Sequence, residues 1–361
     1  MKKYKIGIIG CGGIAFGKHL PAIQQVNRGE ITAFCDLELA KAEKAAKQFG
    51  APGAKVYTDY RELLKDETID ICYVLTPNRS HADISCDAMR AGKHVLCEKP
   101  MAKTAADARR MVQVAKETGK KLTIGYQHRH KTASDYARDL IARGDLGEIY
   151  YSKALAIRRR GTPNWGVFLN EYEQGGGPLI DIGTHSLDLT LYLMNNFAPR
   201  MVVGTSYKKV ENADCGNPWG GWKETENLEM EDAAFGFIVM KNGATITLDA
   251  TWALNTCEPI QEGSCELHGS KAGLRVRGNE AVVNKCEFNR QVLINPNLES
   301  GGVAFYEGLK LTPSVVEQIR WFDAIDNDTP PVVLPEQACV VSEILEAIYT
   351  SAKTGKPVYF D

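Results

Sequence analysis

The fold is decided near the start of the chain, by the stretch Lys5-Ile6-Gly7-Ile8-Ile9-Gly10-Cys11-Gly12-Gly13-Ile14-Ala15. Its apolar first half predicts a buried strand, and the residues from 13 to 27 predict a helix. The turn between them has the form G-x-G-x-x-A, whose glycines allow a tight turn and a close approach of backbone N–H groups to a pyrophosphate. Free N–H groups at the helix start favour an anion. The stretch therefore predicts a dinucleotide-binding turn, with a plain strand–helix turn as the alternative. The candidate cofactor-binding residues in it are Gly10, Gly12, Gly13, Ile14 and Ala15.

An acidic residue ends the next predicted strand. Asp36 lies 21 residues after Ala15, where a carboxylate would accept hydrogen bonds from the hydroxyls of the adenosine ribose. The negative charge of Asp36 would repel the 2′-phosphate of NADP, and no arginine that could bind this phosphate follows immediately in the sequence. We therefore expect NAD rather than NADP as the cofactor. The alternative is that Asp36 only caps the following helix.

Strand and helix signals alternate over the first third of the chain, which predicts a parallel sheet covered by helices. The predicted strands are 5–10, 31–36, 70–75, 94–97 and 121–125, and the predicted helices between them are 13–27, 38–49, 80–91 and 104–118.

Beyond Tyr126 strands follow one another, and the hairpin signal Lys241-Asn242-Gly243 indicates an antiparallel or mixed sheet. Here the predicted strands are 148–157, 201–210, 233–240, 244–254, 264–268 and 281–288, with helices at 134–143, from Pro178, at 312–326 and at 335–353. We expect an α/β protein with two domains, 1–126 and 127–361, whose C-terminal helix could pack back on the first domain.

The composition excludes several classes of protein. A chain of 361 residues with 44% hydrophobic side chains suits two globular domains, and 43 Lys and Arg against 45 Asp and Glu give no basic excess for nucleic acid. The apolar run at the N-terminus is too short for a secretory signal, and no run is long enough to span a membrane. Ten cysteines without a C-x-x-C pair predict a reduced, cytoplasmic protein, and we expect no metal.

Three further stretches carry a resemblance to a known family: 76–81 (TPNRSH), 91–100 (AGKHVLCEKP) and 175–185 (GGGPLIDIGTH). In this order and spacing they resemble the sugar and polyol oxidoreductases named after glucose–fructose oxidoreductase, inositol dehydrogenase and MocA (Gfo/Idh/MocA). The resemblance covers essentially the whole chain. It implies an N-terminal Rossmann domain that binds NAD, and a C-terminal α/β domain with a large mixed, mostly antiparallel open sheet. Because this sheet commonly mediates oligomer contacts, a homodimer or homotetramer is expected.

Lys99, Asp181 and His185 are the candidate catalytic residues. Asp181 and His185 are four residues apart in a predicted helix and would share one face. A histidine can take a hydroxyl proton while the carbon loses hydride, and a lysine can stabilise the developing alkoxide. The resemblance implies that all three surround the reacting carbinol, with His185 as the base. For each residue taken alone, a structural or solvated role is the alternative.

The resemblance adds further candidates around the cofactor. It implies that Thr76, Pro77 and Asn78 line the cofactor channel, that Glu98 and Lys99 lie beside the cofactor, and that Gln127 lies near the nicotinamide. By contrast, His19, His81 and His94 are interpreted as packing or capping residues.

Two segments are candidates for substrate specificity, 160–170 and 212–227, because tryptophan faces stack on pyranose rings while polar side chains bind hydroxyls. Ordinary loop anchoring is the alternative for each tryptophan. Of the three arginines at 158–160, we expect one to face the active-site cleft and the others to be solvated. The candidate substrate-binding residues are Lys99, Arg158, Trp165, Asp181 and His185.

The leading hypothesis is an NAD-dependent oxidoreductase that transfers hydride between the nicotinamide and a secondary alcohol of a sugar, sugar derivative or cyclic polyol. The alternative is a glycosidase-like enzyme that uses tightly bound NAD for transient oxidation and elimination. A non-catalytic regulator that senses a dinucleotide is disfavoured because Lys99, Asp181 and His185 are all present.

Overall fold

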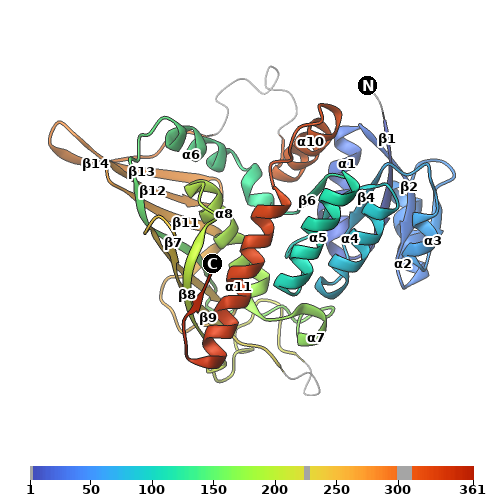
Figure 1. Ribbon diagram of the computed structural model, residues 1–361. Helices are drawn as coiled ribbons and strands as arrows, with labels where there is room; N and C mark the ends of the chain where they lie inside the picture. The colour runs from blue at the N-terminus through green and yellow to red at the C-terminus, as the bar shows by residue number, and fades with distance from the viewer. Residues whose placement is uncertain (1–2, 223–227, 299–310) are drawn as a thin grey trace. The chain divides into compact units, whose positions relative to one another are not determined.

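The computed structural model describes residues 3–222, 228–298 and 311–361, which form two compact units. Unit 1 comprises residues 1–127 and 310–339, and unit 2 comprises residues 128–309 and 340–361. Each unit is built on one sheet, of six strands in unit 1 and nine in unit 2 (Figure 1). Among the described residues, every helix is too short or too polar to cross a bilayer.

Unit 1 contains a parallel sheet with the strand order β3-β2-β1-β4-β5-β6. Its strands are β1 (Tyr4–Ile9), β2 (Gly29–Cys35), β3 (Lys55–Tyr57), β4 (Ile71–Val74), β5 (His94–Cys97) and β6 (Leu122–Ile124). The chain first runs outward from β1 to β3 and then continues with β4 on the other side of β1. The strand order therefore reverses between β1 and β4, and ligands of open α/β sheets bind at such a point, beyond the carboxyl ends of the strands. This confirms the predicted Rossmann-like domain.

The helices of unit 1 complete its core. They are η1 (Ala15–His19), α1 (Leu20–Val26), α2 (Leu39–Phe49), α3 (Tyr60–Leu64), η2 (Asn78–Ser80), α4 (His81–Arg90), α5 (Ala105–Thr118) and α10 (Pro313–Asp326). Helix α10 lies beside α1 (Figure 1), and its Trp321 and Phe322 are buried in the same cluster as Ile6 and Ile8 of β1. A segment near the C-terminus therefore belongs to the hydrophobic core of the first sheet.

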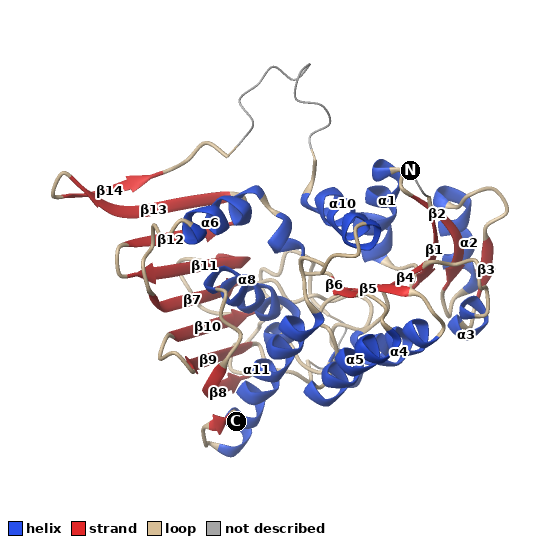
Figure 2. Ribbon diagram, turned by 45° about the horizontal axis from the view of Figure 1, so that its top comes forward, coloured by secondary structure: helices blue, strands red, loops and turns tan. Residues whose placement is uncertain are grey.

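Unit 2 contains a mixed sheet with the order β14-β13-β12-β11-β7-β10-β9-β8-β15 (Figure 2). Its strands are β7 (Ile149–Ile157), β8 (Pro199–Tyr207), β9 (Ala233–Met240), β10 (Thr245–Thr251), β11 (Ile260–Gly269), β12 (Ala272–Arg277), β13 (Glu280–Glu287), β14 (Arg290–Ile294) and β15 (Val358–Tyr359). Its helices are α6 (Thr132–Ala142), α7 (Glu171–Gln174), η4 (Leu179–Gly183) and α8 (Thr184–Met194); η3 (Gln127–His130) and α11 (Pro335–Thr354) each run from unit 1 into unit 2.

One face of this sheet is covered and the other is open. Among the described strands of this nine-stranded sheet, only β7 and β10 pair in parallel, and the remaining neighbours are antiparallel. Helices α6, α8 and α11 lie on the covered face (Figure 2). In β9, Gly236 and Ile238 point to this face and are buried, whereas Phe237 is exposed on the other. This alternation is typical of a sheet with one solvated face, and it confirms the predicted open, mostly antiparallel sheet.

The helix predicted from Pro178 differs from the expectation of a regular α-helix. It begins with the π-helical turn η4, which contains Asp181, and becomes α-helical only at Thr184. The simple four-residue spacing of an α-helix therefore does not relate Asp181 to His185. Single π turns of this kind are frequent at functional sites.

Candidate active site

The glycine turn after β1 leaves its backbone open. Gly10 has a φ of 98°, and a Cβ there would lie 2.6 Å from the carbonyl carbon and oxygen of Leu75. Only glycine fits this position. A Cβ on Gly12 or Gly13 would meet nothing within 4 Å, and Ala15 is buried where η1 begins. The turn thus has the open, N–H-rich form that a pyrophosphate requires.

Asp36 fastens the end of β2 to this turn. Its Oδ2 accepts a hydrogen bond from the N–H of Cys11 at 2.8 Å, and its Oδ1 accepts one from the N–H of Glu38 at 2.9 Å. The N-cap of α2 is Glu38, so Asp36 does not cap that helix. An ionised carboxylate can accept about four hydrogen bonds, which leaves acceptor sites on Asp36 for ribose hydroxyls.

The other predicted cofactor residues follow the carboxyl ends of neighbouring strands in the same sheet. Thr76, Pro77 and Asn78 come after β4, Glu98 and Lys99 after β5, and Gln127 after β6. Since β1, β4, β5 and β6 are adjacent and parallel, these residues share one edge of the sheet with the glycine turn and Asp36.

His81 supports this edge without taking part in ionic chemistry. Its two ring nitrogens lie 2.8 Å from the carbonyl oxygens of Pro100 and Thr76. Burial lowers the pKa of His81, so the ring is neutral at pH 7 and its single N–H donates to one of these two carbonyls. This agrees with the structural role predicted for it, and His94 likewise accepts the N–H of Lys121 at 3.0 Å.

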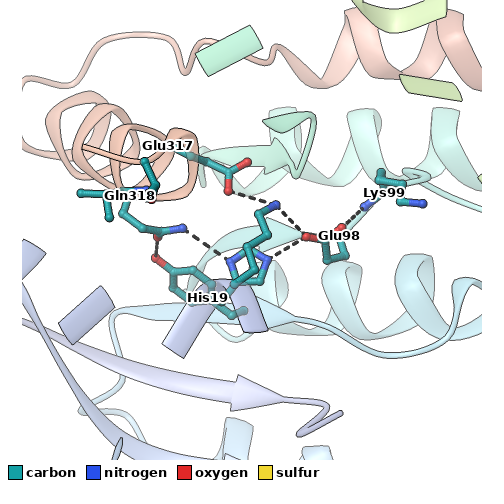
Figure 3. Close-up of polar contacts among 9 residues, drawn as sticks. His19, Glu98, Lys99, Glu317 and Gln318 are labelled. Carbon is teal, nitrogen blue, oxygen red and sulfur yellow. Dashed lines mark hydrogen bonds and ion pairs between the residues drawn. The ribbon is translucent and has the colours of Figure 1, made fainter. Parts of the chain in front are cut away.

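Glu98 lies in a buried ionic network (Figure 3). Its Oε1 is 2.8 Å from the Nζ of Lys18 and 2.7 Å from the Nε2 of His19. Lys18 also pairs with Glu317 of α10 at 3.1 Å, and the side chains of Lys18, Glu98 and Glu317 are 7%, 7% and 4% exposed. The Oε2 of Glu98 accepts the N–H of Lys99 at 3.0 Å. The network thus holds the backbone of the candidate catalytic lysine.

The charges in this network stabilise one another. Burial alone would raise the pKa of Glu98, but Lys18 and the hydrogen bond from His19 hold it well below its usual range. Burial would likewise lower the pKa of Lys18, but Glu317 and Glu98 raise it above its usual value. Glu98 is therefore an anion and Lys18 a cation at neutral pH. His19, interpreted as a packing or capping residue, is fully buried and packs edge-on against Tyr73. The π turn η1 in addition directs Lys18 and His19 to the Glu98 carboxylate.

Asp181 and His185 have defined neighbours within unit 2. The indole N–H of the fully buried Trp252 donates to the Oδ2 of Asp181 at 3.0 Å. The buried ring of His185 packs edge-on against His128, with ring centroids 4.9 Å apart. Neither Trp252 nor His128 was expected from the sequence, although His128 directly follows Gln127 in the motif region.

A partly buried carboxylate fixes the start of the helix that carries Asp181. Glu231 accepts hydrogen bonds from the N–H groups of Gly177 and Leu179 at 3.1–3.3 Å and from the hydroxyl of Tyr349 at 2.7 Å. A Cβ on Gly176 would lie 2.1 Å from the Tyr349 hydroxyl. The glycine run before Pro178 is therefore required by close packing against these two side chains, and this run is the sequence signal that could have revealed Glu231 as a positioning residue.

The two predicted specificity segments contact each other. The Nδ2 of Asn164 donates to the carbonyls of residues 219, 220 and 221, and that of Asn217 donates to the carbonyl of Thr162. Trp165 and Trp219 lie with ring centroids 4.9 Å apart. Residues 223–227 of the second segment lie outside the described residues.

The three consecutive arginines after β7 hold loops. Arg158 pairs with Glu262 at 3.3 Å and donates to the carbonyl of Gly161 at 2.8 Å. Arg159 donates to the carbonyls of residues 256 and 257, and Arg160 to Asn255. Arg159 is exposed, as expected of a solvated arginine, and the neighbouring 255–257 turn in addition offers acceptors to both Arg159 and Arg160.

The candidate residues thus fall into two sets. Unit 1 contains the glycine turn, Asp36, Lys99 and the residues around them, whereas unit 2 contains Arg158, Trp165, Asp181 and His185. Within the described ranges, no group of three or more His, Cys, Asp or Glu side chains is arranged to hold a metal.

Comparison with known proteins assigns a family to both units. Residues 4–126 match the family model described as "Oxidoreductase family, NAD-binding Rossmann fold", and residues 138–360 match the model "Oxidoreductase family, C-terminal alpha/beta domain" of the same family. The chain belongs to the Gfo/Idh/MocA oxidoreductase family. This confirms the resemblance noted in the sequence and shows an NAD-binding oxidoreductase.

Relatives of known name in the Gfo/Idh/MocA family include two that match most of the chain. The D-glucoside 3-dehydrogenase of Escherichia coli strain K12 is 32% identical over 357 residues, which cover 98% of this chain and 97% of the relative. The 1,5-anhydro-D-fructose reductase of Ensifer adhaerens is 34% identical over 313 residues, covering 84% of this chain and 87% of the relative. Among solved structures, levoglucosan dehydrogenase in complex with NADH and levoglucosan has a TM-score of 0.83 at 22% identity, with 99% of each chain covered. That likeness supports the fold.

Proposed function

We propose that this protein is an NAD-dependent dehydrogenase or reductase that acts on a secondary hydroxyl of a sugar, sugar derivative or cyclic polyol. The observation that carries the proposal is Lys99, held through its backbone by the buried Glu98 at the sheet edge that also bears the glycine turn and Asp36. The relatives support the substrate class, since their names include a D-glucoside 3-dehydrogenase, a 1,5-anhydro-D-fructose reductase and an inositol 2-dehydrogenase.

The chemistry follows from three side chains of this chain. Lys99 donates a hydrogen bond to the oxygen of the substrate hydroxyl and stabilises the negative charge that develops there. His185 accepts the hydroxyl proton while the C–H electron pair leaves as hydride. Asp181, fixed by the indole N–H of Trp252, binds a neighbouring hydroxyl or orients His185. NAD, when bound, supplies the hydride acceptor, and ketone reduction uses the same groups in reverse.

Asp36 supports NAD over NADP as the cofactor. Its carboxylate is fixed by the N–H groups of Cys11 and Glu38, so it cannot turn away from a ligand without breaking both hydrogen bonds. A ribose 2′-hydroxyl can donate to this carboxylate, whereas a 2′-phosphate would be repelled by it. Thr76, Pro77, Asn78 and Gln127 line the remainder of the proposed cofactor site.

The open face of the unit 2 sheet supports a homodimer or homotetramer. Val203 of β8 is paired directly with Phe237 of β9, and both side chains are exposed on that face. Neighbouring exposed apolar side chains favour association with a second copy. All ten cysteines are described and are free thiols, seven of them buried, which supports a reducing compartment such as the cytoplasm.

The proposal is tested by following NADH absorbance with purified protein, NAD and a panel of monosaccharides, glycosides and inositols, with every hit repeated with NADP. We expect NAD-linked turnover on one substrate class, and loss of that turnover in Lys99→Ala and His185→Ala but not in the exposed control Lys41→Met. If no compound of the panel gives NADH, and the protein releases NAD when it is denatured, the results would instead favour the glycosidase-like cycle.

A further inference from the structure

Two tryptophan side chains lie half exposed beside each other in unit 2. Trp165 is 48% and Trp219 44% exposed, and their rings meet at an angle of 80°. Phe168 packs edge-on against Trp165, with ring centroids 5.6 Å apart. We call Trp165, Phe168 and Trp219 the indole corner. The two half-exposed indoles and Phe168 thus form one contiguous aromatic patch, and such patches mark binding sites more often than single exposed apolar side chains do.

Two asparagine side chains hold the corner in place. The Nδ2 of Asn164 lies 2.7, 3.2 and 3.1 Å from the carbonyl oxygens of Trp219, Gly220 and Gly221. From the other segment, the Nδ2 of Asn217 donates to the carbonyls of Thr162 and Gly220 at 2.9 and 2.8 Å. Each segment therefore anchors the other through an asparagine. A ligand that binds such a preorganised surface does not have to order the loops first.

The corner is connected to the candidate catalytic carboxylate through packed side chains. Phe168 packs against the buried cluster that contains Ile182 and Trp252, and Trp252 donates its indole N–H to Asp181. Phe168 thus contacts both Trp165 and the cluster of Trp252, and Trp252 in turn holds Asp181. Because the contacts from Trp165 reach Asp181 only through these intervening side chains, we assign the ring stacked on Trp165 and the ring that Asp181 contacts to neighbouring positions.

The charges around the corner are compensated. The guanidinium of Arg158 lies 5.6 Å from the centre of the Trp219 ring, but it also pairs with Glu262 at 3.3 Å. The corner therefore offers aromatic surface with polar groups at its margin and no unpaired charge in these contacts. This combination suits a neutral pyranose ring, whose C–H face stacks on an indole while its hydroxyls remain hydrated or bind polar neighbours.

We propose that the indole corner is a binding subsite for the second, non-reacting ring of a neutral disaccharide or oligosaccharide glycoside. The proposal rests on the proposed function and makes it more specific, because it assigns this protein to glycosides with a sugar aglycone rather than to free monosaccharides. Reaction at the hydroxyl and recognition of the second ring are then performed by separate parts of unit 2.

The test compares kcat and KM for glucose, methyl glucoside, phenyl glucoside and a set of glucose disaccharides in wild type, Trp165→Ala and Trp219→Ala. We expect the lowest KM for a disaccharide, and an increase of about ten-fold in that KM in each variant, which corresponds to about 1.4 kcal/mol of lost binding. The kcat, and the kcat/KM for glucose and methyl glucoside, should stay within about two-fold. Phe288→Ala, which removes an almost fully exposed aromatic ring between β13 and β14, serves as the matched control.

Three results would overturn the proposal: equal losses for monosaccharides and disaccharides, unchanged KM in both tryptophan variants, or a preference for phenyl glucoside over every disaccharide. The last result would assign the corner to an aromatic aglycone. Calorimetric titration of the full chain with the same disaccharides separates this test from the proposed function. If no sugar is turned over, but a disaccharide binds and either tryptophan variant abolishes that binding, the proposed function is refuted and the proposed subsite is supported. If no disaccharide binds, the proposed subsite is refuted.

Discussion

Replacing Lys18 by methionine should destabilise unit 1 strongly, because its ammonium group is shared by two buried carboxylates. Lys18 lies 2.8 Å from Glu98 and 3.1 Å from Glu317, and all three side chains are less than a tenth exposed. Removing one partner of a buried ion pair costs about 3–5 kcal/mol, since an uncompensated charge stays behind. Glu98 retains His19 at 2.7 Å, whereas Glu317 loses its ion pair with Lys18. We therefore expect a loss of about 3–5 kcal/mol in the free energy of unfolding, with partial recovery in Lys18→Met/Glu317→Gln.

Lys18→Met should also change how the free energy of unfolding depends on pH between 5 and 8. In the wild type the lowered pKa of Glu98 adds stability above the ordinary glutamate pKa of about 4.3, and this is lost as the pH falls through the folded value. The raised pKa of Lys18 adds stability below about 10.4, which is lost as the pH rises through its folded value. Stability from the network is thus nearly constant from about pH 5 to 9. In Lys18→Met, Glu98 loses the ammonium group that lowers its pKa, while its burial, which raises the pKa, remains, so stability should rise as the pH falls from 8 to 5.

Calorimetry and guanidinium unfolding would measure both effects, with the transition of unit 1 identified as the one that NAD shifts upward. Lys41→Met is the matched control, because Lys41 pairs with Glu38 at 2.6 Å on an exposed surface and such pairs contribute about 0–1 kcal/mol. The reasoning is refuted if Lys18→Met is as stable as Lys41→Met, or if its stability stays constant or falls as the pH decreases from 8 to 5.

Three further predictions concern the proposed cofactor site at Asp36 and the turn before Asp181. Asp36→Ala should raise the Kd of NAD about 10- to 100-fold and reduce its preference over NADP, as measured by fluorescence titration of both dinucleotides; an unchanged ratio of the two affinities would contradict the role of the carboxylate. Tyr349→Phe leaves Glu231 with one hydrogen bond fewer and should lower the free energy of unfolding by about 1–3 kcal/mol. Glu231→Ala should in addition lower kcat, because the turn before Asp181 loses the carboxylate that holds its N–H groups. Gly176→Ala should destabilise by at least about 1–3 kcal/mol through its clash with Tyr349, while Gly17→Ala, where a Cβ meets nothing within 4 Å, should have a small effect on the melting temperature.

The elements of unit 1 were predictable where the sequence pattern and the burial agree. Strand β5 was predicted at its observed bounds, and α5 lies within its predicted range, with Thr104 as a hydroxyl cap at its start and Gly119 ending it at a φ of 65°. By contrast, β3 and α3 were missed, because each is five residues or shorter and β3 has no fully buried side chain. In unit 2, β12 and β14 were not predicted. Charged side chains interrupt the apolar pattern of β12, and β14 is an edge strand with little burial.

The site was predictable as a set of residues but not as a set of interactions. The sequence motifs contain Lys99, Asp181 and His185, yet nothing in them indicates that Glu98 binds Lys18 and His19, about 80 residues earlier, or that Lys18 reaches Glu317 in α10. Such partners depend on the tertiary fold. The π turns η1 and η4 were also unforeseen, because they look like ordinary helix starts in the sequence and arise from the packing around them.

The membership of α10 in unit 1 has a consequence for how the protein is made. Residues 1–127 leave the ribosome first, but Glu317, Trp321 and Phe322, which complete their ionic network and hydrophobic core, follow only about 190 residues later. At about 5–20 residues per second, translation needs roughly 10–40 s to supply them. During that interval Lys18 lacks one of its two carboxylates and the face of β1 is uncovered. Unit 1 is therefore complete only after α10 has been made, and unit 2 only after residues 340–361 have followed. A fragment transferred to another protein as the nucleotide-binding unit consequently needs α10 as well as residues 1–127.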